Sequence, residues 1–365
     1  MRRVFAAIAA RRFRRAQILT GGLADGPPAA GEEKAMRNMV SAAAGLLAAL
    51  TLLSGAAWAE ELLVGGQTVG IDISSDGVIV SGFAEVETAE GSASPAGDAG
   101  FEPGDVIIAA DGTEVRSADE LISAVAELDG RETELTVLRG GATLKLRVRP
   151  AMSSSGQWML GMWMRDSVSG IGTLTFVDPA SGTFGALGHG VNDENGSEPV
   201  PLRSGTLCDA EIIGVHPGAA GQPGELCGSC DSGRTLGSVE RNTPEGVFGR
   251  ASPGLGGEAL SAGRIRTGEA KMIATVAGHE TEEYSVRIDR VYNDGGQTHA
   301  MLTVTDSRLR ERAGGIVRGM SGSPIIQDGR IVGAVTHVFV NDPTRGFAIG
   351  IYDMLEAAGL GELAA

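Results

Sequence analysis

Aromatic residues are scarce in this sequence, and long stretches with helical periodicity are scarce as well. Phe, Trp and Tyr make up 4% of the 365 residues, whereas glycine occurs 56 times. Short apolar segments interrupted by glycine dominate instead, and such segments are typical of strands joined by tight turns. The composition therefore argues against a helical protein. It predicts a mainly β chain that is long enough for two domains of ordinary size.

Positive charge is also in short supply. Lys and Arg number 30 against 46 Asp and Glu, which gives a formal net charge of −16 at pH 7. An acidic surface repels phosphate backbones and offers no basic stripe along which a nucleic acid could lie. We therefore expect no nucleic-acid partner.

Cysteine occurs only three times, at Cys208, Cys227 and Cys230. An odd number of cysteines does not make a disulfide framework. Together with His216 they form a C-x7-H-x10-C-x2-C pattern, but its spacing is irregular for a zinc site. Three states remain open: one disulfide with a leftover thiol, a zinc site, or plain small residues. We predict no metal and no cofactor.

The first 59 residues have the pattern of a targeting segment rather than of a folded domain. After a basic, alanine-rich start, Met36 opens a second pattern: a basic residue, an apolar run over 39–53 and the ending Ala-Trp-Ala at 57–59. This order is that of a secretory signal peptide cleaved before Glu60. The alternative is a retained membrane anchor, since the run is near the lower length limit for a span. We expect an exported protein that starts at Met36, with residues 1–35 as an upstream extension.

Residues 60–150 resemble a PDZ domain, a module that binds extended peptides. A helix over 117–128 is predicted from the residues alone, because Ser117 can cap it and apolar residues recur at helical spacing. The features that carry the resemblance are the run Gly-Phe-Glu-Pro-Gly-Asp-Val-Ile at 100–107, the turn at 111–112, this helix and a final hairpin turned at 140–141.

In PDZ domains a bound peptide adds a strand beside the long helix, and backbone amides of a preceding loop hold its carboxylate. The resemblance places this site on Gly70, Ile71, Asp72 and Ile73. The ligand would be a peptide or a segment of the protein's own chain. The alternative is that Ile71 and Ile73 belong to the core.

A Ser-rich linker at 151–157 leads to a second domain at 158–360. This domain contains about a dozen short apolar runs separated by turn residues, a number typical of a β-barrel or a sandwich. Between two of these runs lies Gly-Met-Ser-Gly-Ser-Pro at 319–324. Glycines on both sides of Ser321 would leave its hydroxyl open, and the amides of Gly319 and Ser321 would both point at one oxygen, as in an oxyanion hole. The alternative is an ordinary Gly/Ser turn between strands.

The loop at 319–324 resembles the G-D-S-G-G-P nucleophile loop of chymotrypsin-like proteases, which implies a double β-barrel with Ser321 as nucleophile. His189 ends an apolar strand in a glycine-flanked turn, so we assign it as the general base. His337 lies within an apolar run and is expected to be a wall or core residue. Asp306 is the candidate acid, with an N-cap of the following helix as the alternative role. Asp294 and Asp193 are its rivals.

The order His, Asp, Ser argues against an α/β-hydrolase, in which the serine comes first. Residues 62–355 further resemble the stage IV sporulation protein B (SpoIVB) peptidase family. This resemblance implies a triad of His189, Asp306 and Ser321. The matching stretches in the second domain are 165–176, 184–189, 241–249, 314–326 and 333–344. The cysteines and the arginine-rich extension depart from the family pattern.

The SpoIVB resemblance also implies a role. Such a peptidase is exported from the forespore into the space between the two spore membranes. There it cuts the extracytoplasmic part of a membrane-bound inhibitory complex, which leads to activation of a late sigma factor. Its PDZ domain restrains or targets the protease, and self-cleavage accompanies maturation.

Met320 stands where digestive proteases carry an Asp that pairs with a newly cut N-terminus. Methionine cannot form that ion pair, so we predict that activity needs no new N-terminus beside Ser321. Two other functions fit the sequence less well. A general envelope quality-control protease shares both modules but places the protease first, and a non-enzymatic PDZ scaffold would not need the His, Asp and Ser set.

Overall fold

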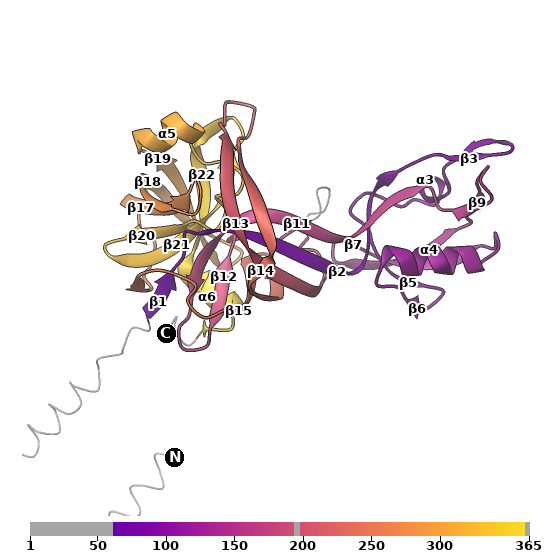
Figure 1. Ribbon diagram of the computed structural model, residues 1–365, viewed down its shortest axis with the longest axis horizontal. Helices are drawn as coiled ribbons and strands as arrows, with labels where there is room; N and C mark the ends of the chain where they lie inside the picture. Colours follow the sequence, from indigo (N-terminus) through magenta and orange to yellow (C-terminus); the bar gives the residue numbers. More distant parts are fainter. Residues whose placement is uncertain (1–60, 193–197, 362–365) are drawn as a thin grey trace, which may run out of the picture. The chain divides into compact units, whose positions relative to one another are not determined.

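The computed structural model describes residues 61–192 and 198–361, which form a mainly β structure (Figure 1). This confirms the fold class predicted from the composition. The predicted targeting segment, residues 1–59, lies outside the described residues. Within the described ranges, no helix is both long enough and apolar enough to cross a membrane.

The first barrel is a closed ring of antiparallel strands. Within the described ranges its order is β11, β12, β15, β14, β13 and β2, and β2 pairs again with β11 to close the ring. Two short strands, β1 and β16, continue the sheet beside β11. The bounds are β1 (Glu61–Val64), β2 (Thr68–Phe83), β11 (Met162–Val177), β12 (Thr183–Ala186), β13 (Leu202–His216), β14 (Glu225–Thr243), β15 (Gly246–Ala251) and β16 (Ala259–Ser261).

The core of the first barrel follows from the two-residue period of its strands. On β2, the side chains of Val69, Ile71 and Ile73 are buried, whereas Asp72 between them is exposed. Because successive side chains point to opposite faces of a strand, the three apolar residues face the barrel interior. There they join apolar residues from the other strands, among them Leu174, Phe184, Leu207 and Val247.

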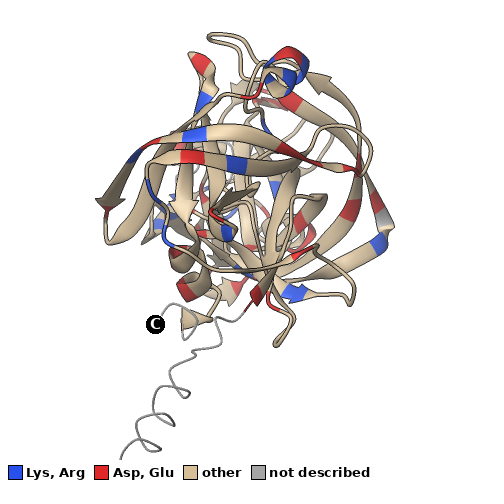
Figure 2. Ribbon diagram, turned by 90° about the vertical axis from the view of Figure 1, so that its left-hand side faces the viewer, with Lys and Arg blue, Asp and Glu red and all other residues tan. Residues whose placement is uncertain are grey.

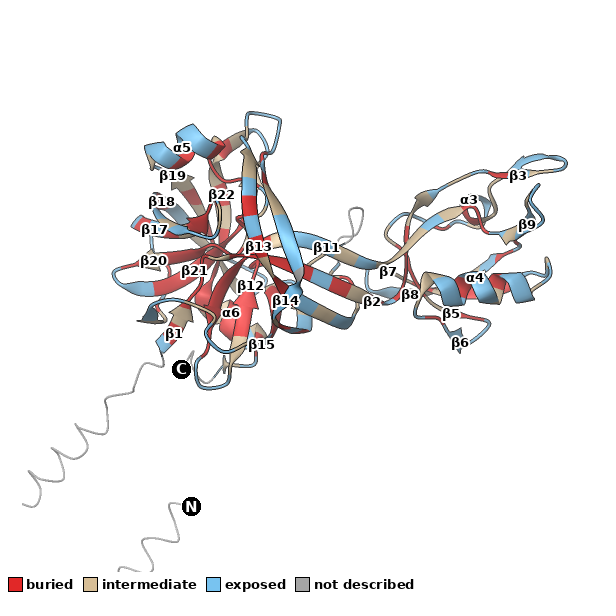
Figure 3. Cartoon of the chain, in the orientation of Figure 1, coloured by how far each residue is buried: buried red, intermediate tan, exposed pale blue. Residues whose placement is uncertain are grey.

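The second barrel closes in the strand order β17, β18, β19, β22, β21, β20. Its interior is filled by aliphatic side chains, and Figure 3 shows the strands β20 and β21 as largely buried. The bounds are β17 (Gly268–Thr275), β18 (Thr281–Asp294), β19 (Gln297–Val304), β20 (Pro324–Gln327), β21 (Arg330–Phe339) and β22 (Asp342–Gly350), with helices α5 (Ser307–Ala313) and α6 (Ile351–Ala357). With the first barrel, this gives the predicted double β-barrel.

The PDZ part is a small sheet with one long helix. Its helix α4 (Ala118–Glu127) begins where the sequence predicted, because the Ser117 side chain accepts a hydrogen bond from the Glu120 amide. Leu121 and Val125 on its inner face are buried. The other bounds are β3 (Val86–Thr88), β4 (Gly91–Ala93), α3 (Pro95–Asp98), β5 (Val106–Ala110), β6 (Thr113–Glu114), β7 (Thr133–Arg139), β8 (Ala142–Val148), β9 (Ala151–Met152) and β10 (Trp158–Met159).

A buried ion pair explains part of the PDZ signature. The Asp105 side chain is fully buried and accepts two hydrogen bonds from the Arg139 guanidinium, at 2.6 and 2.7 Å. The same guanidinium also donates to the Glu102 carboxylate and to the Gly100 carbonyl oxygen. A buried carboxylate is tolerated only with such partners, so the run at 100–107 is tied to the last hairpin of the PDZ part.

The boundary between the two domains differs from the prediction. Residues 61–75 were expected to open the PDZ domain, but they pair with β11, β13 and β16 and belong to the first barrel. Strands β2 and β11 run through both parts, since residues 78–83 and 162–165 of the same two strands join the PDZ sheet. The PDZ part is therefore an insertion within the first barrel. An alternating strand fits either sheet, and only its pairing partners decide between them.

Charged side chains of both signs are interspersed on the surface. Figure 2 shows Lys and Arg mixed with Asp and Glu along the strands and loops of the side in view. Several exposed pairs are in contact, such as Arg266 with Asp328 and Lys271 with Glu283. Exposed pairs of this kind contribute little to stability.

Candidate active site

A pocket of about 610 Å³ contains two of the three predicted catalytic residues, His189 and Ser321. The first barrel contributes residues of β2, of β11 and of the segment after β12. The second barrel contributes the segment before β20 and part of β21. A pocket that is lined by both barrels and contains a serine and a histidine is the arrangement that hydrolytic chemistry needs.

Ser321 lies in a tight loop that two glycines make possible. Gly319 and Gly322 have φ angles of +95° and +94°, a region that other residues rarely adopt. Two threonines of β11 hold this loop. The Thr173 hydroxyl donates to the Gly319 carbonyl oxygen at 2.9 Å, and the Thr175 hydroxyl donates to the Gly322 carbonyl oxygen at 2.8 Å. The loop is therefore fixed to the first barrel on one side.

The amide groups of Gly319 and Ser321 are available to a ligand. Within the part of the chain that the structure describes, neither amide donates a hydrogen bond to a protein acceptor. The Arg318 carbonyl accepts from the Leu226 amide at 2.9 Å. The Gly319 amide belongs to the same planar peptide group, so it points in the opposite direction, away from Leu226. The Arg318 amide donates to the Gly224 carbonyl oxygen at 2.9 Å. The β13–β14 hairpin thus orients the predicted oxyanion hole.

The Ser321 hydroxyl donates to the Thr336 carbonyl oxygen at 2.6 Å. A hydroxyl carries a single proton, so in this state it does not donate to His189. The hydroxyl is thus bonded to a backbone carbonyl rather than to its base, which is a resting geometry of the nucleophile.

His189 follows β12 in a turn where Leu187 and Gly188 have φ angles of +70° and +69°. Its Nδ1 lies 2.8 Å from the Gly190 carbonyl oxygen. A carbonyl oxygen can only accept, so Nδ1 carries the proton and Nε2 keeps a lone pair. Burial holds the pKa of His189 below its ordinary value, and the bond to Gly190 opposes this effect only in part. His189 is thus neutral at pH 7 and presents the tautomer that a general base needs.

His337 lies against His189 and belongs to the site. The two ring centroids are 4.7 Å apart, with the ring planes at 31°. Burial of this face and repulsion from His189 lower the pKa of His337 to about 4, although its other side is exposed to solvent. The sequence predicted a wall or core role for this residue. The structure places it in the wall of the catalytic pocket.

Asp306 does not join His189 and Ser321 in the pocket, which corrects its assignment as the acid of the triad. Its carboxylate caps α5 by accepting from the Arg308 amide at 2.9 Å and also accepts from the Ser285 amide and the Arg308 guanidinium. The Arg308 side chain holds the pKa of Asp306 below its ordinary value. The alternative N-cap role is the one that the structure shows.

Of the two rivals of Asp306, Asp294 does not replace it. Asp294 is the last residue of β18, next to the turn that leads to β19, and is not among the residues that line the pocket. Asp193 lies outside the described residues. Among the residues that the structure describes, the pocket is thus lined without a carboxylate.

Asn242, which was not among the predicted site residues, holds the segment that follows His189. Its side-chain oxygen accepts from the Val191 amide at 2.8 Å. Its nitrogen donates to the carbonyl oxygens of Val191 and Val200, at 2.8 and 2.9 Å. The one available signal was its place in the stretch 241–249 that resembles the SpoIVB family. We assign Asn242 as a positioning residue.

The predicted peptide site on Gly70, Ile71, Asp72 and Ile73 is wrong. These four residues pair with β11 on one side and with β13 on the other, so no edge remains to which a peptide could add. Ile71 and Ile73 are core residues, which was the alternative for them.

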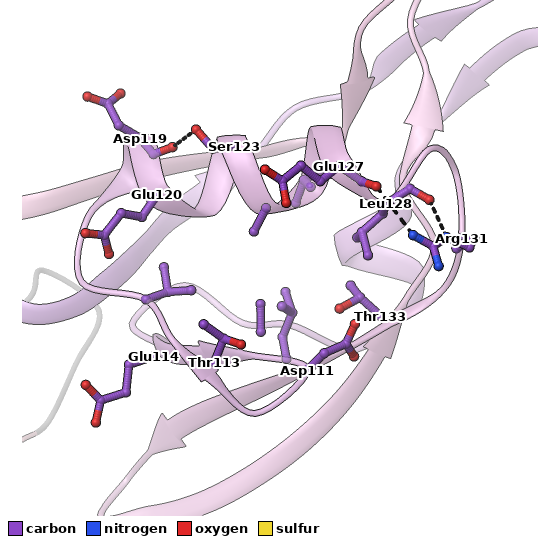
Figure 4. Close-up of a pocket in the computed structure, with 15 residues that line it drawn as sticks. Asp111, Thr113, Glu114, Asp119, Glu120, Ser123, Glu127, Leu128, Arg131 and Thr133 are labelled. Atoms are coloured by element: carbon purple, nitrogen blue, oxygen red, sulfur yellow. Dashed lines mark hydrogen bonds between the residues drawn. The ribbon is translucent and has the colours of Figure 1, made fainter.

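The chain's own segment 158–166 lies beside helix α4 instead. At one end of the helix, the Trp158 indole donates to the Asp129 carboxylate at 3.3 Å. At the other end, the Ala118 amide donates to the Asp166 carboxylate at 3.3 Å. A second hollow of about 580 Å³ lies between α4, β6 and β7, with acidic side chains along the helix (Figure 4). Exposed carboxylates alone do not make it a binding site.

The zinc alternative does not fit the positions of the cysteines. Cys227 and Cys230 are three residues apart on β14. The register shift between their partners is a bulge on β13, where Ile213 is unpaired, so the alternation of β14 continues from Cys227 to Cys230. They therefore point to opposite faces of the sheet and cannot converge on one ion. Within the described residues, no three His, Cys, Asp or Glu side chains are grouped as metal ligands.

Two closed six-stranded barrels, with a serine and a neutral histidine in the pocket between them, define a chymotrypsin-like serine peptidase. The pattern of the SpoIVB peptidase S55 family matches residues 156–355, and that of the PDZ domain matches residues 88–139. The first match covers more than half of the chain, so this protein belongs to the SpoIVB peptidase S55 family.

No curated protein matches this chain. Among solved structures, it is similar to the Rv3671c protease of M. tuberculosis. The active form is 13% identical, over 53% of this chain and 75% of that chain, with a TM-score of 0.30. An inactive form is 13% identical, over 52% of this chain and 84% of that chain, with a TM-score of 0.29.

Proposed function

We propose that this peptidase cleaves peptide bonds by attack of the Ser321 hydroxyl on a carbonyl carbon. His189 Nε2 takes the hydroxyl proton and later gives it to the leaving amine. The amides of Gly319 and Ser321 hold the negative charge that develops on the carbonyl oxygen. The observation that carries this proposal is that His189 and Ser321 line one pocket beside two amides that, among the described residues, have no protein acceptor.

The Gly190 carbonyl takes over one task of the acid that the described lining of the pocket lacks. In a Ser-His-Asp triad, the carboxylate fixes the histidine tautomer and stabilises the imidazolium that forms. Here the hydrogen bond from Nδ1 to Gly190 fixes the tautomer, and a carbonyl dipole gives the cation weaker support than a full charge. The mechanism is therefore a Ser–His pair with backbone support.

We further propose that the protein is exported and acts in sporulation signalling. Its substrate would be the extracytoplasmic part of a membrane-bound regulatory complex, whose cleavage leads to activation of a late sigma factor, with self-cleavage during maturation. Membership of the SpoIVB peptidase S55 family supports this role. The predicted signal peptide supports export.

The PDZ part would restrain or target the peptidase. Strand β11 gives this role a physical basis, because residues 162–165 belong to the PDZ sheet while residues 168–171 line the catalytic pocket. A peptide that displaces the chain's own segment 158–166 from α4 would pull on the strand that forms the pocket wall. The partner of the PDZ part is then a peptide that competes with this segment.

Labelling with a fluorophosphonate probe tests the nucleophile. We expect the purified protein to be labelled on Ser321, and Ser321→Ala to lose labelling and peptidase activity. Ser323→Ala is a matched control in the same loop. Its hydroxyl is fully buried and, among the described residues, has no hydrogen-bond partner, so its removal should be neutral. Labelling that survives in Ser321→Ala and disappears in Ser323→Ala would overturn the assignment.

The biological role needs a separate test. Incubation of the active protein with the purified extracytoplasmic part of a candidate complex should give defined fragments, and Ser321→Ala should give none. A protein that is labelled by the probe and leaves such substrates intact would keep the peptidase assignment and refute the signalling role.

A further inference from the structure

Cys208 and Cys230 lie together on the outer face of the first barrel. Cys208 pairs directly with Gly70 of β2, and Cys230 pairs with Ala210, two residues along β13 from Cys208. Leu207 is part of the barrel core, so its neighbour Cys208 points to the other face. The pairing of Ala210 with Cys230 puts Cys230 on the same face as Cys208.

The two sulfur atoms share the space above one glycine. A methyl group at Gly70 would overlap both the Cys208 and the Cys230 sulfur atoms, which shows that each sulfur lies close to the same point. The register of β14 is irregular next to these cysteines: Asp209 pairs with Asp231, whereas its neighbour Cys208 pairs with Thr235. The extra residues of β14 form a bulge beside the two sulfur atoms.

The third cysteine cannot take part. Cys227 points to the opposite face of β14 from Cys230, so it can reach neither of the other two sulfur atoms without disrupting the strand. The structure thus selects one of the three possible pairs.

We propose that Cys208 and Cys230 form an intramolecular disulfide that cross-links β13 to β14, with a small-molecule or protein disulfide as the oxidant. The thiolate of the exposed Cys230 attacks the oxidant and forms a mixed disulfide, and one thiol leaves. Cys208 then attacks the Cys230 sulfur and the second thiol leaves. In total, two protein thiols are oxidised to one disulfide and the oxidant is reduced to two thiols.

The two cysteines differ in their access to solvent, as the order of these steps requires. Cys230 is exposed, and Cys208 is buried. Burial and the neighbouring Cys230 thiol raise the pKa of Cys208 to about 11, so Cys208 stays protonated at neutral pH and does not react first with an outside oxidant. The Cys208 thiol is in direct contact with Cys230. Its role is to attack the Cys230 sulfur and so resolve the mixed disulfide.

The cross-link would act on the hairpin that orients the oxyanion hole. It closes the chain between residues 208 and 230, and this loop contains Gly224 and Leu226, whose backbone groups bond to both sides of Arg318. A closed loop loses less conformational entropy on folding, so the oxidised protein should be more stable. The hairpin should also open less often in the folded state.

The test uses the chain from Glu60 onward, the part expected after removal of the signal peptide. Three forms are compared: the wild type, Cys230→Ser and, as matched control, Cys227→Ser. Each is incubated with oxidised glutathione, alkylated and mapped by mass spectrometry without reduction. We expect a peptide that links Cys208 to Cys230 in the wild type and in Cys227→Ser, with alkylation of the wild type at Cys227 only. The Tm of both should exceed that of Cys230→Ser by about 5 °C. Hydrogen exchange at the Leu226 amide should slow on oxidation.

Four results would overturn the proposal: three alkylated cysteines after oxidation, a disulfide that includes Cys227, a covalent dimer through Cys230, or a stable glutathione adduct on Cys230 with Cys208 still free. Cys230 is exposed, so its replacement by serine leaves the fold intact and a negative result is not the consequence of unfolding.

Discussion

The imidazole rings of His189 and His337 lie against each other, with centroids 4.7 Å apart and planes tilted by 31°, and neither ring has a carboxylate partner among the described contacts. A protonated ring beside another protonated ring is unfavourable, and burial disfavours either charge. Both pKa values are accordingly below the ordinary value for histidine. The pair therefore stays neutral over the pH range in which one of its members must act as a base.

The first prediction concerns the pH dependence of activity. The free enzyme needs neutral His189, so kcat/KM should fall toward acid pH with a midpoint below about 6.5, the ordinary value for histidine. Burial, not charge repulsion, lowers the pKa of His189, and His337 is neutral above about pH 4, so His337→Gln should leave this midpoint close to that of the wild type. Measurement of kcat/KM between about pH 4.5 and 8 checks both statements. A midpoint at or above the ordinary histidine value in the wild type would show that His189 is not held in a buried, neutral state.

The lowered pKa of His337 has a consequence for the free energy of unfolding, with a definite sign. Folded His337 has a pKa of about 4, whereas the unfolded chain binds a proton near about pH 6.5. The unfolded state therefore binds more protons between these values, and stability is lost as the pH falls from about 6.5 to about 4. Solvent reaches the outer side of His337, which limits the size of the effect. NMR titration of the imidazole protons, with His337→Gln to identify the resonance, measures the pKa of His337 in the folded protein, and this pKa fixes the size of the effect.

The second prediction separates the two roles of Asp306. If its carboxylate only caps α5 and pairs with Arg308, Asp306→Asn should cost no more than about 1 kcal/mol of the free energy of unfolding. The value of kcat/KM should stay within about tenfold of the wild type, whereas loss of a triad acid would lower kcat by about 10⁴-fold. Arg308→Ala is the matched control, because it breaks the same ion pair from the other side. A collapse of activity in Asp306→Asn alone would restore Asp306 to the triad.

The third prediction concerns Asn242. Its side chain makes three hydrogen bonds to the segment after His189, so Asn242→Ala should cost about 2–3 kcal/mol of the free energy of unfolding. A shift of that segment moves the general base, and we expect kcat/KM to fall by about 10²-fold. Asn293→Ala is the control, since that side chain accepts one bond in an exposed turn. Denaturant unfolding and steady-state kinetics on both variants decide. Unchanged kinetics in Asn242→Ala would remove its positioning role.

The fourth prediction concerns Met320, which is fully buried in the core of the second barrel. Met320→Leu conserves volume and should cost less than about 1.5 kcal/mol, with activity retained. Met320→Asp would bury a carboxylate and should prevent stable folding. Because the loop needs no ion pair at this position, forms of the protein with different N-terminal residues should have the same kcat/KM. Activity that depends strictly on one N-terminal residue would contradict this.

Part of the protein could be predicted from the sequence because the signals are local. The glycines around Ser321 and beside His189 permit turns that other residues rarely form, and they stand next to the two residues that do chemistry. The cap of α4 by Ser117 is likewise a contact over three residues. For such features, the identity of neighbours along the chain determines the backbone.

Only the tertiary structure decided the rest, because the same local pattern fits more than one set of distant partners. The alternation of Val69, Ile71 and Ile73 suits a strand of either domain, and pairing with β13 placed it in the barrel. Asp306 can cap a helix or face a histidine, and the position of Arg308 decided for the cap. Three cysteines allow three pairs, and the face of the sheet on which each lies leaves one, because a strand points alternate side chains to opposite sides.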